Sequence, residues 1–160
     1  MWLDRSDIVG FRVDHVVQTP WCGAFSMDDI STCRVFVRLS TGRNFELSHV
    51  DRGRPAEPIR DVDLSNIEIV DAEFDGIRGP CGGAAASVVG ARIQAVLFDP
   101  RGWWQSFGLW LSSGFIVYFG TNEVPVRWMG ACLDGPFSRA ELVHHLDYWT
   151  RSPFDSDELG

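Results

Sequence analysis

Cysteine and histidine are the residue types in this chain that could support covalent or acid–base chemistry. The four cysteines, Cys22, Cys33, Cys81 and Cys132, are scattered, and no two of them form a C-x-x-C pair. This spacing lacks the pattern of a zinc site or a redox dithiol, and in a reducing compartment it predicts free thiols. Cys81 has the most suggestive neighbours, because it lies in a glycine-rich stretch just before a predicted short helix at 84–89.

Cys81 is the candidate nucleophile, since the positive end of a helix dipole favours a thiolate. The tetrapeptide Cys-Gly-Gly-Ala that begins there resembles the nucleophile segment of papain-like cysteine peptidases. That resemblance implies a base, which would be His144 or His145. Only eight residues separate Cys81 from Gly90, where a strand unit is predicted to begin, so the long nucleophile helix of those peptidases does not fit. A cysteine-dependent enzyme is therefore kept as an alternative function.

Neither a phosphate loop nor a metal site is predicted. The chain has 14 basic residues, all of them arginine, so the lysine that a P-loop requires is missing, and G-x-G-x-x-G is absent too. His15 and His49 have no second ligand at helical or hairpin spacing. The segment that starts at Asp61 begins like a calcium loop, but it has Asn66 where glycine is required and Ala72 where the bidentate glutamate belongs. The sequence therefore predicts no cofactor and no metal ion.

Charge and length restrict the class of partner. The chain has 160 residues, enough for one compact domain over 1–160, and 22 acidic residues give it a formal charge of −8. Such a balance leaves no general basic surface for phosphates, so it disfavours nucleic acid and favours a basic partner protein. No segment approaches 18 consecutive apolar residues, and the first residues include Asp4 and Asp7 without a signal-peptide-like apolar run. We therefore expect no membrane span and a cytoplasmic location.

An internal repeat is the most informative feature of the sequence. Residues 10–17 align with 90–97 at an offset of 80, and residues 37–42 align with 109–114 at an offset of 72. The second half has therefore lost eight residues from the loop between the two matches, where surface connections tolerate deletion.

The repeat predicts two related units, at about 8–74 and 90–132, each made of antiparallel strands. Alternating and β-branched residues mark the strands, and Gly42 and Gly114 supply positive φ at two hairpin turns. The predicted strands span 8–19, 34–39, 43–48 and 66–74, and then 91–98, 106–111, 115–120 and 124–132. The expected fold class is α+β and mostly β, with two related antiparallel β-meander or hairpin units forming one sheet pair or a distorted barrel.

A C-terminal helix is predicted over 138–150 and is expected to pack on the sheets. Ser138 and Glu141 form a capping box, and Phe137 can staple to Leu142. Two further segments lack a periodic pattern: an exposed loop is predicted at 51–63 and an acidic tail at 154–160.

Tryptophans in two loops form the candidate partner-binding surface. Trp21 lies in the loop 19–32, which also holds Asp28 and Asp29, and Trp103 and Trp104 lie in the matching loop of the second unit. Exposed tryptophan flanked by acid is typical of a protein-binding surface, and burial of these side chains in the core is the alternative interpretation. The tryptophans on patterned segments are predicted to be core residues: Trp110, Trp128 and Trp149.

The chain resembles, in a general way, the small immunity proteins with which bacteria neutralise a cognate toxin. The resemblance rests on its size, its acidity and two tandem hairpin segments, Leu-Ser-Thr-Gly at 39–42 and Leu-Ser-Ser-Gly at 111–114. The resemblance implies stoichiometric inhibition, in which an acidic, aromatic surface binds a basic toxin directly. The alternatives are a β domain that binds a small molecule, a structural assembly subunit and the Cys81 enzyme.

Overall fold

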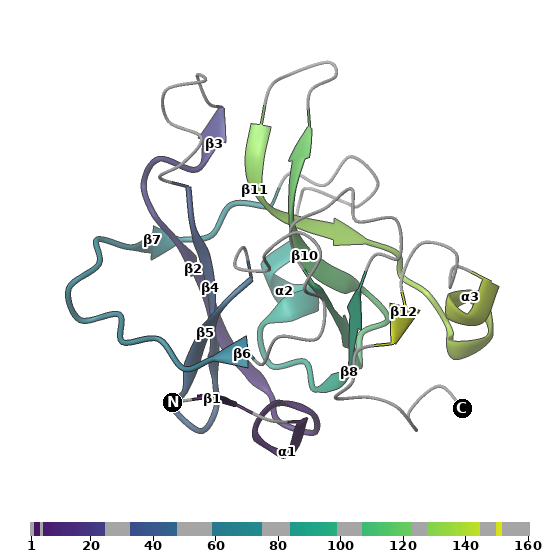
Figure 1. Ribbon diagram of the computed structural model, residues 1–160. Helices are drawn as coiled ribbons and strands as arrows, with labels where there is room; N and C mark the ends of the chain where they lie inside the picture. The colour runs from purple at the N-terminus through teal and green to yellow at the C-terminus, as the bar shows by residue number, and fades with distance from the viewer. Residues whose placement is uncertain are drawn as a thin grey trace.

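Two antiparallel β-sheets make up most of the protein (Figure 1). The computed structural model describes residues 2–3, 5–24, 33–47, 59–74, 84–98, 107–122, 128–144 and 150–151. Within these residues the fold is mostly β and the two sheets form a pair without closing into a barrel, which confirms the predicted fold class.

The first sheet has the strand order β5-β4-β2-β7. Its strands are β2 (Val13–Gln18), β4 (Val35–Leu39), β5 (Asn44–Glu46) and β7 (Val70–Asp71). The second sheet has the order β12-β8-β9-β10-β11-β3. Its strands are β3 (Gly23–Ala24), β8 (Ile93–Phe98), β9 (Phe107–Leu111), β10 (Ile116–Asn122), β11 (Trp128–Asp134) and β12 (Thr150–Arg151).

Short elements complete the two sheets. β1 (Trp2–Leu3) pairs with β6 (Ile59–Arg60) as a separate two-stranded ladder. The helices are α1 (Arg5–Ile8), α2 (Ala84–Val88) and α3 (Arg139–His144).

The two sheets meet where β2 and β8 begin, and the hydrogen bonds there are reciprocal. The amide of Gly10 donates to the carbonyl oxygen of Ile93 at 2.8 Å, and the amide of Gly90 donates to that of Val13 at 2.7 Å. Adding 80 to the number of Gly10 gives Gly90, and subtracting 80 from that of Ile93 gives Val13, so the two bonds are equivalent under the repeat. An approximate two-fold rotation therefore relates the two halves at this crossing.

The same relation extends to the outer edges of the two sheets. β7 pairs with β2 through Gln18 and Val70, and β12 pairs with β8 through Phe98 and Thr150. Because Phe98 is the counterpart of Gln18 at the offset of 80, β12 occupies in the second sheet the position that β7 occupies in the first.

Alternation along the strands places one set of side chains between the sheets. Phe45 from β5 and Phe107 from β9 meet there, with ring centroids 6.1 Å apart, in the offset and tilted geometry that aromatic pairs favour. The interior also holds the inward-facing residues of the two central hairpin strands, all fully or almost fully buried: Val35, Val37, Leu39, Leu109 and Leu111.

The outer face of each sheet is covered by the chain segment that follows its hairpin. Leu64, with Val62, Ile67 and Ile69 beside it, packs on Val17 and Phe36 of the first sheet. Leu142 and Phe137 pack on the outer face of the second sheet. The capping box predicted at the start of this covering helix is confirmed by the two reciprocal bonds between Ser138 and Glu141, of 3.0 and 3.1 Å.

Several predicted boundaries are wrong, each because tertiary packing overrides local pattern. The helix predicted over 138–150 is described as α3 up to His144, residues 145–149 lie outside the described residues, and Thr150–Arg151 is a strand that pairs with the edge of β8. The strand predicted over 66–74 is reduced to β7, because Ile67 and Ile69 fold over the outer face instead.

The remaining differences concern segment ends. The strand predicted to start at Ile8 starts at Val13, after the turn of α1. The loop predicted over 51–63 contains β6 at its end. The predicted tail at 154–160 lies outside the described residues.

Replacement of the two hairpin glycines by alanine is expected to destabilise the protein unequally. Gly42 and Gly114 have φ values of 87° and 91°, which confirms the predicted conformation. Gly42→Ala should lower the free energy of unfolding by about 1–2 kcal/mol, the cost of a left-handed residue with a Cβ. Gly114→Ala should cost more, because the added Cβ would lie 3.1 Å from the Phe137 carbonyl oxygen, whereas that of residue 42 meets nothing within 4 Å. Urea denaturation followed by circular dichroism measures both, and equal losses would contradict the argument.

Candidate protein-binding surface

The turn that follows β2 presents Trp21 to solvent. Its side chain is 53% exposed, although tryptophan is usually largely buried in folded proteins. The apolar ring of an exposed tryptophan is unfavourably hydrated in the free protein, and its burial by a partner contributes strongly to the binding free energy. Trp21 is therefore a candidate anchor residue.

Hydrogen bonds and a proline hold this turn in one conformation. The amide of Cys22 donates to the carbonyl oxygen of Thr19 at 3.2 Å, which closes a four-residue turn, and Pro20 presets φ at its second position. Thr19 is fixed to the start of β4 by two bonds of 3.0 Å, one from its own amide to the Arg34 carbonyl oxygen and one from the Arg34 amide to its hydroxyl. Trp21 is therefore carried on a preorganised turn.

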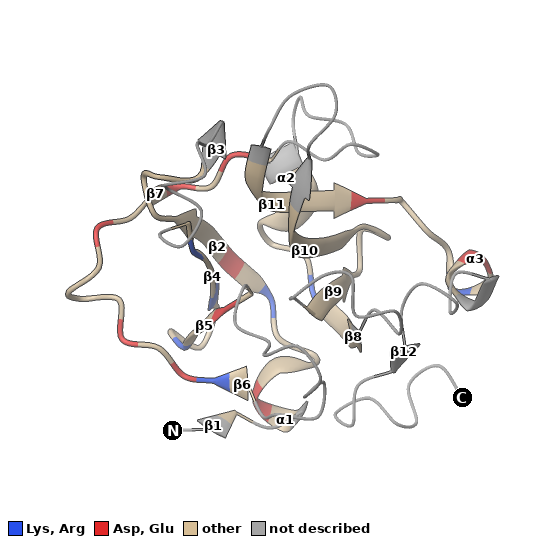
Figure 2. Ribbon diagram, turned by 45° about the horizontal axis from the view of Figure 1, so that its top comes forward, with Lys and Arg blue, Asp and Glu red and all other residues tan. Residues whose placement is uncertain are grey.

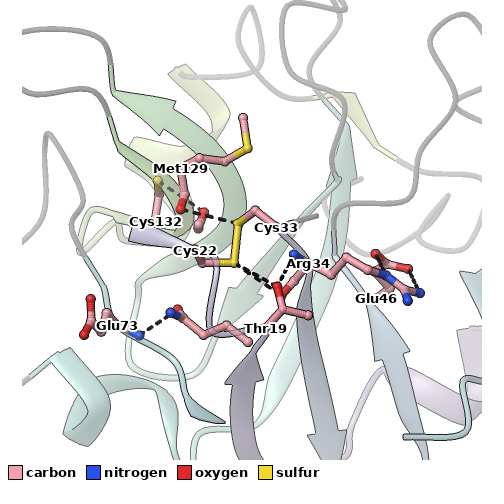
Figure 3. The surroundings of a disulfide bond; sticks show 10 residues. Thr19, Cys22, Cys33, Arg34, Glu46, Glu73, Met129 and Cys132 are labelled. Atoms are coloured by element: carbon pink, nitrogen blue, oxygen red, sulfur yellow. Dashed lines mark hydrogen bonds and ion pairs between the residues drawn. A yellow bond between two sulfur atoms is a disulfide. The ribbon is translucent and has the colours of Figure 1, made fainter. Parts of the chain in front are cut away.

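A disulfide bond between Cys22 and Cys33 closes the loop that the turn begins (Figure 3). The prediction that all four cysteines are free thiols is therefore wrong for these two, while Cys132 is a buried thiol outside any disulfide bond. The antiparallel pairing of β2 with β4 continues to Thr19 and Arg34, so it brings Cys22 and Cys33 just beyond the paired strands to a Cα separation of 4.7 Å. Spacing of 11 residues in the sequence gave no sign of this proximity.

The disulfide also contacts the second sheet (Figure 3). Its Cys33 Sγ lies 3.5 Å from the carbonyl oxygen of Met129 in β11. On the other side the Thr19 hydroxyl lies 3.6 Å from Cys22 Sγ, and the hydroxyl must be the donor because a disulfide sulfur carries no hydrogen. The base of the Trp21 turn thus touches β4 and β11 together.

Arg34, the residue that anchors the turn, is paired with a carboxylate (Figure 3). Its Nε and Nη2 donate to the two oxygens of Glu46 at 2.8 and 2.9 Å, and its guanidinium lies 4.9 Å from the centre of the Phe36 ring. The hydrogen bond to Glu46 raises the pKa of Arg34 above its usual value and outweighs the opposing effect of burial. Because Glu46 neutralises this cation, the turn gains no net positive charge from it.

An acidic segment runs from the end of β6 to just beyond β7 (Figure 2). Residues 61–73 contain five acidic residues and no basic one. Four of the five side chains are exposed to solvent: Asp63, Glu68, Asp71 and Glu73. The segment gives the first half of the molecule a continuous negative strip, which we call the acidic strip.

The acidic strip is held to the first sheet by polar contacts. The amide of Glu73 donates to the buried side chain of Gln18 at 2.9 Å, and Asp71 Oδ1 lies 2.6 Å from His15 Nε2. Ser65 donates its amide to Asp63 at 3.0 Å, and this bond lowers the pKa of the exposed Asp63 carboxyl. These contacts hold the acidic strip in place relative to β2.

Only part of the predicted surface falls in the described residues. Trp21 is exposed, as the binding hypothesis requires, and Trp110 is buried, which confirms its predicted core position. Several other candidates lie outside the described residues: Asp28, Asp29, Trp103, Trp104, Cys81, His145 and Trp149. His144 ends α3 and Trp128 begins β11, and their side chains are outside the description as well.

The strands that lead to the two tryptophan loops run away from each other. β2 and β8 are antiparallel at their crossing, as the Arg12–Arg92 bridge shows, so their far ends at Gln18 and Phe98 diverge. The structure therefore shows no single face joining the two strand ends. Its described candidate surface consists of the Trp21 turn and the acidic strip.

Sequence reasoning missed two parts of this surface. The disulfide depends on a strand pairing that no local pattern reports. The acidic strip was predicted partly as loop and partly as a strand, and the signal that could have identified it was the lack of any basic residue from 61 to 73.

Comparison of the chain with family models, with curated proteins and with solved structures found no match. Within the described ranges, no group of three or more histidine, cysteine or carboxylate side chains is placed to hold a metal ion. Among the same residues no helix has the length and apolar character needed to cross a bilayer.

Loss of the disulfide is expected to lower stability and loosen the Trp21 turn. The double variant Cys22→Ser, Cys33→Ser should lower the free energy of unfolding by about 3 kcal/mol, the chain-entropy value for a loop of this length. Denaturant unfolding with and without dithiothreitol provides the measurement. The reductant should destabilise the natural protein and leave the double variant unchanged, and an equal response of the two would refute a structural role for the bond.

Proposed function

We propose that this protein binds a basic partner protein directly, and that it acts as a stoichiometric inhibitor of a bacterial toxin in the manner of an immunity protein. The observation that carries the proposal is the exposed Trp21 on a turn that a disulfide, a proline and three hydrogen bonds hold rigid. A rigid surface aromatic is the kind of residue that dominates binding energy in protein interfaces.

Preorganisation of the turn favours tight binding. An inhibitor must lose little conformational freedom when it binds, because that loss subtracts from affinity. Here Cys22 and Thr19 are already fixed on either side of Trp21 before any partner arrives. Tryptophan itself has only two side-chain torsions, so little further entropy is lost when it enters a pocket.

Charge determines the chemistry of the partner. The chain carries a formal charge of −8, and five of its carboxylates lie in the acidic strip, a sequence segment that contains no basic residue. Such a field accelerates association with a positively charged protein and suppresses association with an acidic one. A toxin that acts on nucleic acid or on membranes has a basic surface of the kind this field attracts.

The first test is to isolate and characterise a complex. Tagged full-length protein is recovered from its source cells, and co-eluting proteins are identified by mass spectrometry and purified. The proposal expects one basic protein, a one-to-one complex by size exclusion, and inhibition of that protein's toxicity or activity at equimolar ratio. A partner that is acidic, or that keeps its full activity in the complex, would overturn it.

Trp21→Ala is expected to weaken this complex at least about tenfold, since an anchor residue contributes about 2 kcal/mol or more. Calorimetric titration measures the affinity. Val89→Ala is the matched control, because Val89 is also an exposed apolar residue, 43% exposed, and lies at the end of α2. The control should bind as the natural protein does. Unfolding midpoints of both variants should stay close to that of the natural protein, and equal affinities for the two would remove Trp21 from the interface.

Added salt is expected to lower the association rate constant strongly and to change the dissociation rate constant little. Raising NaCl from about 50 mM to about 500 mM shortens the screening length to a few ångströms, so steering by the acidic strip should be lost. Surface plasmon resonance resolves the two rate constants. An association rate that does not change with salt would contradict a role for charge.

A further inference from the structure

Among the described residues β7 forms an edge of the first sheet, and this edge offers a second kind of contact. We propose that an extended basic segment of the partner adds as a strand to the outer edge of β7, and this inference rests on the proposed function. The binding mode would be β-strand addition, in which main-chain bonds supply affinity and alternate side chains supply specificity.

Backbone geometry leaves Asp71 with its polar main-chain groups directed outward. The amide of Ala72 donates to the carbonyl oxygen of Val16 at 3.0 Å, and the register pairs Asp71 with Val17. Bonded and non-bonded pairs alternate in an antiparallel ladder, so Asp71 belongs to a non-bonded pair. Its N–H and C=O therefore point away from β2, and among the described residues β7 has no paired strand on that side. Beyond β7, Phe74 forms a parallel bridge with Ala131 of β11, so the unpaired edge ends before Phe74.

The side chains at this edge favour positively charged residues on an added strand. Asp71 is 87% exposed at its side chain, and Glu68 and Glu73 on either side of β7 are exposed too. A residue directly opposite Asp71 on an added strand would have its Cβ within about 5.5 Å, close enough for an opposite-charge pair. An acidic strand would meet three carboxylates there, so charge complementarity restricts the occupant to a basic segment.

The second half of the molecule shows that this face has diverged from its counterpart. At offsets of 80 and 72, His15 and Arg38 of the first sheet correspond to Ala95 and Trp110 of the second. The second pair is buried in the cluster that contains Leu142, so α3 covers that row. His15 is partly exposed and Arg38 is exposed, so this row stays polar and open to solvent. The row that Asp71 itself continues passes through the buried Val17 and Phe36. The polar row therefore reaches the β7 edge through the contact between His15 and Asp71.

The test uses the full-length protein, isotopically labelled for NMR, and a synthetic hexapeptide of alternating arginine and valine. Two control peptides replace arginine by glutamate, or carry N-methyl groups on the backbone nitrogens along one edge. The proposal expects amide shifts centred on residues 69–73 with the first peptide. It expects at least about tenfold weaker binding of the N-methylated peptide, which can no longer donate along that edge, and loss of binding with glutamate.

A pair of variants separates main-chain from charge effects. Asp71→Ala removes the carboxylate and keeps the outward N–H, and should weaken peptide binding about threefold. Asp71→Pro also removes that N–H and should weaken binding about a further tenfold. Thermal unfolding of the two variants is compared first. If the proline variant does not fold, the N-methylated peptide carries the decision alone.

The outcomes distinguish this inference from the proposed function. Equal binding of the methylated and unmethylated peptides, or shifts centred away from β7, would overturn strand addition while the isolated complex stands. A purified partner that binds Asp71→Pro and Asp71→Ala equally would do the same. Oligomers of the protein alone that persist in the Asp71→Ala variant and dissociate in the Asp71→Pro variant would place a second copy on this edge and also overturn the inference. Failure to isolate any basic partner would instead count against the proposed function.

Discussion

The reciprocal crossing of β2 and β8 is the constraint on which the rest of the structure depends. Gly10 and Gly90 each donate to the opposite strand, and these bonds orient the two sheets face to face through an approximate two-fold relation. From that crossing the strands diverge, so their hairpins enclose one apolar interior in which Phe45 contacts Phe107. Because the relation is a rotation, equivalent segments of the two halves end at opposite ends of the molecule. Residues that the internal repeat makes equivalent, such as those predicted to form one binding surface, can therefore lie far apart in space.

Each half covers its outer face in a different way, and this difference creates the candidate surface. In the second half α3 and Phe137 bury the row that contains Trp110. In the first half an irregular segment covers Val17 and Phe36, and the neighbouring row of His15 and Arg38 stays polar. The same segment carries the acidic residues, because its apolar side chains alternate inward while the carboxylates face solvent. One stretch of chain thus completes a hydrophobic cluster and charges the surface above it.

Rigidity around Trp21 has the same origin in strand pairing. β4 begins beside the end of β2, and the residues just beyond this paired end are close enough for Cys22 and Cys33 to be bonded. Arg34 joins this network through Thr19 and is neutralised by Glu46, so the turn is fixed without adding positive charge nearby. An exposed aromatic on a fixed support and a negative strip are complementary features of one interface. The first supplies binding energy and the second supplies attraction at a distance.

Local sequence patterns were enough to predict the mostly β fold class, the hairpin turns at Gly42 and Gly114, the capping box at Ser138 and the burial of Trp110. These follow from local signals, namely side-chain period, a positive φ and a cap, which act over a few residues. The disulfide, the reduction of the strand at 66–74 to β7, and the strand at Thr150–Arg151 instead depend on tertiary packing. Each depends on which distant strand lies alongside, and a linear pattern does not contain that information. The exposure of Trp21 belongs to the same group, because a tryptophan in a loop fits a core or a surface equally well until the packing around it exists.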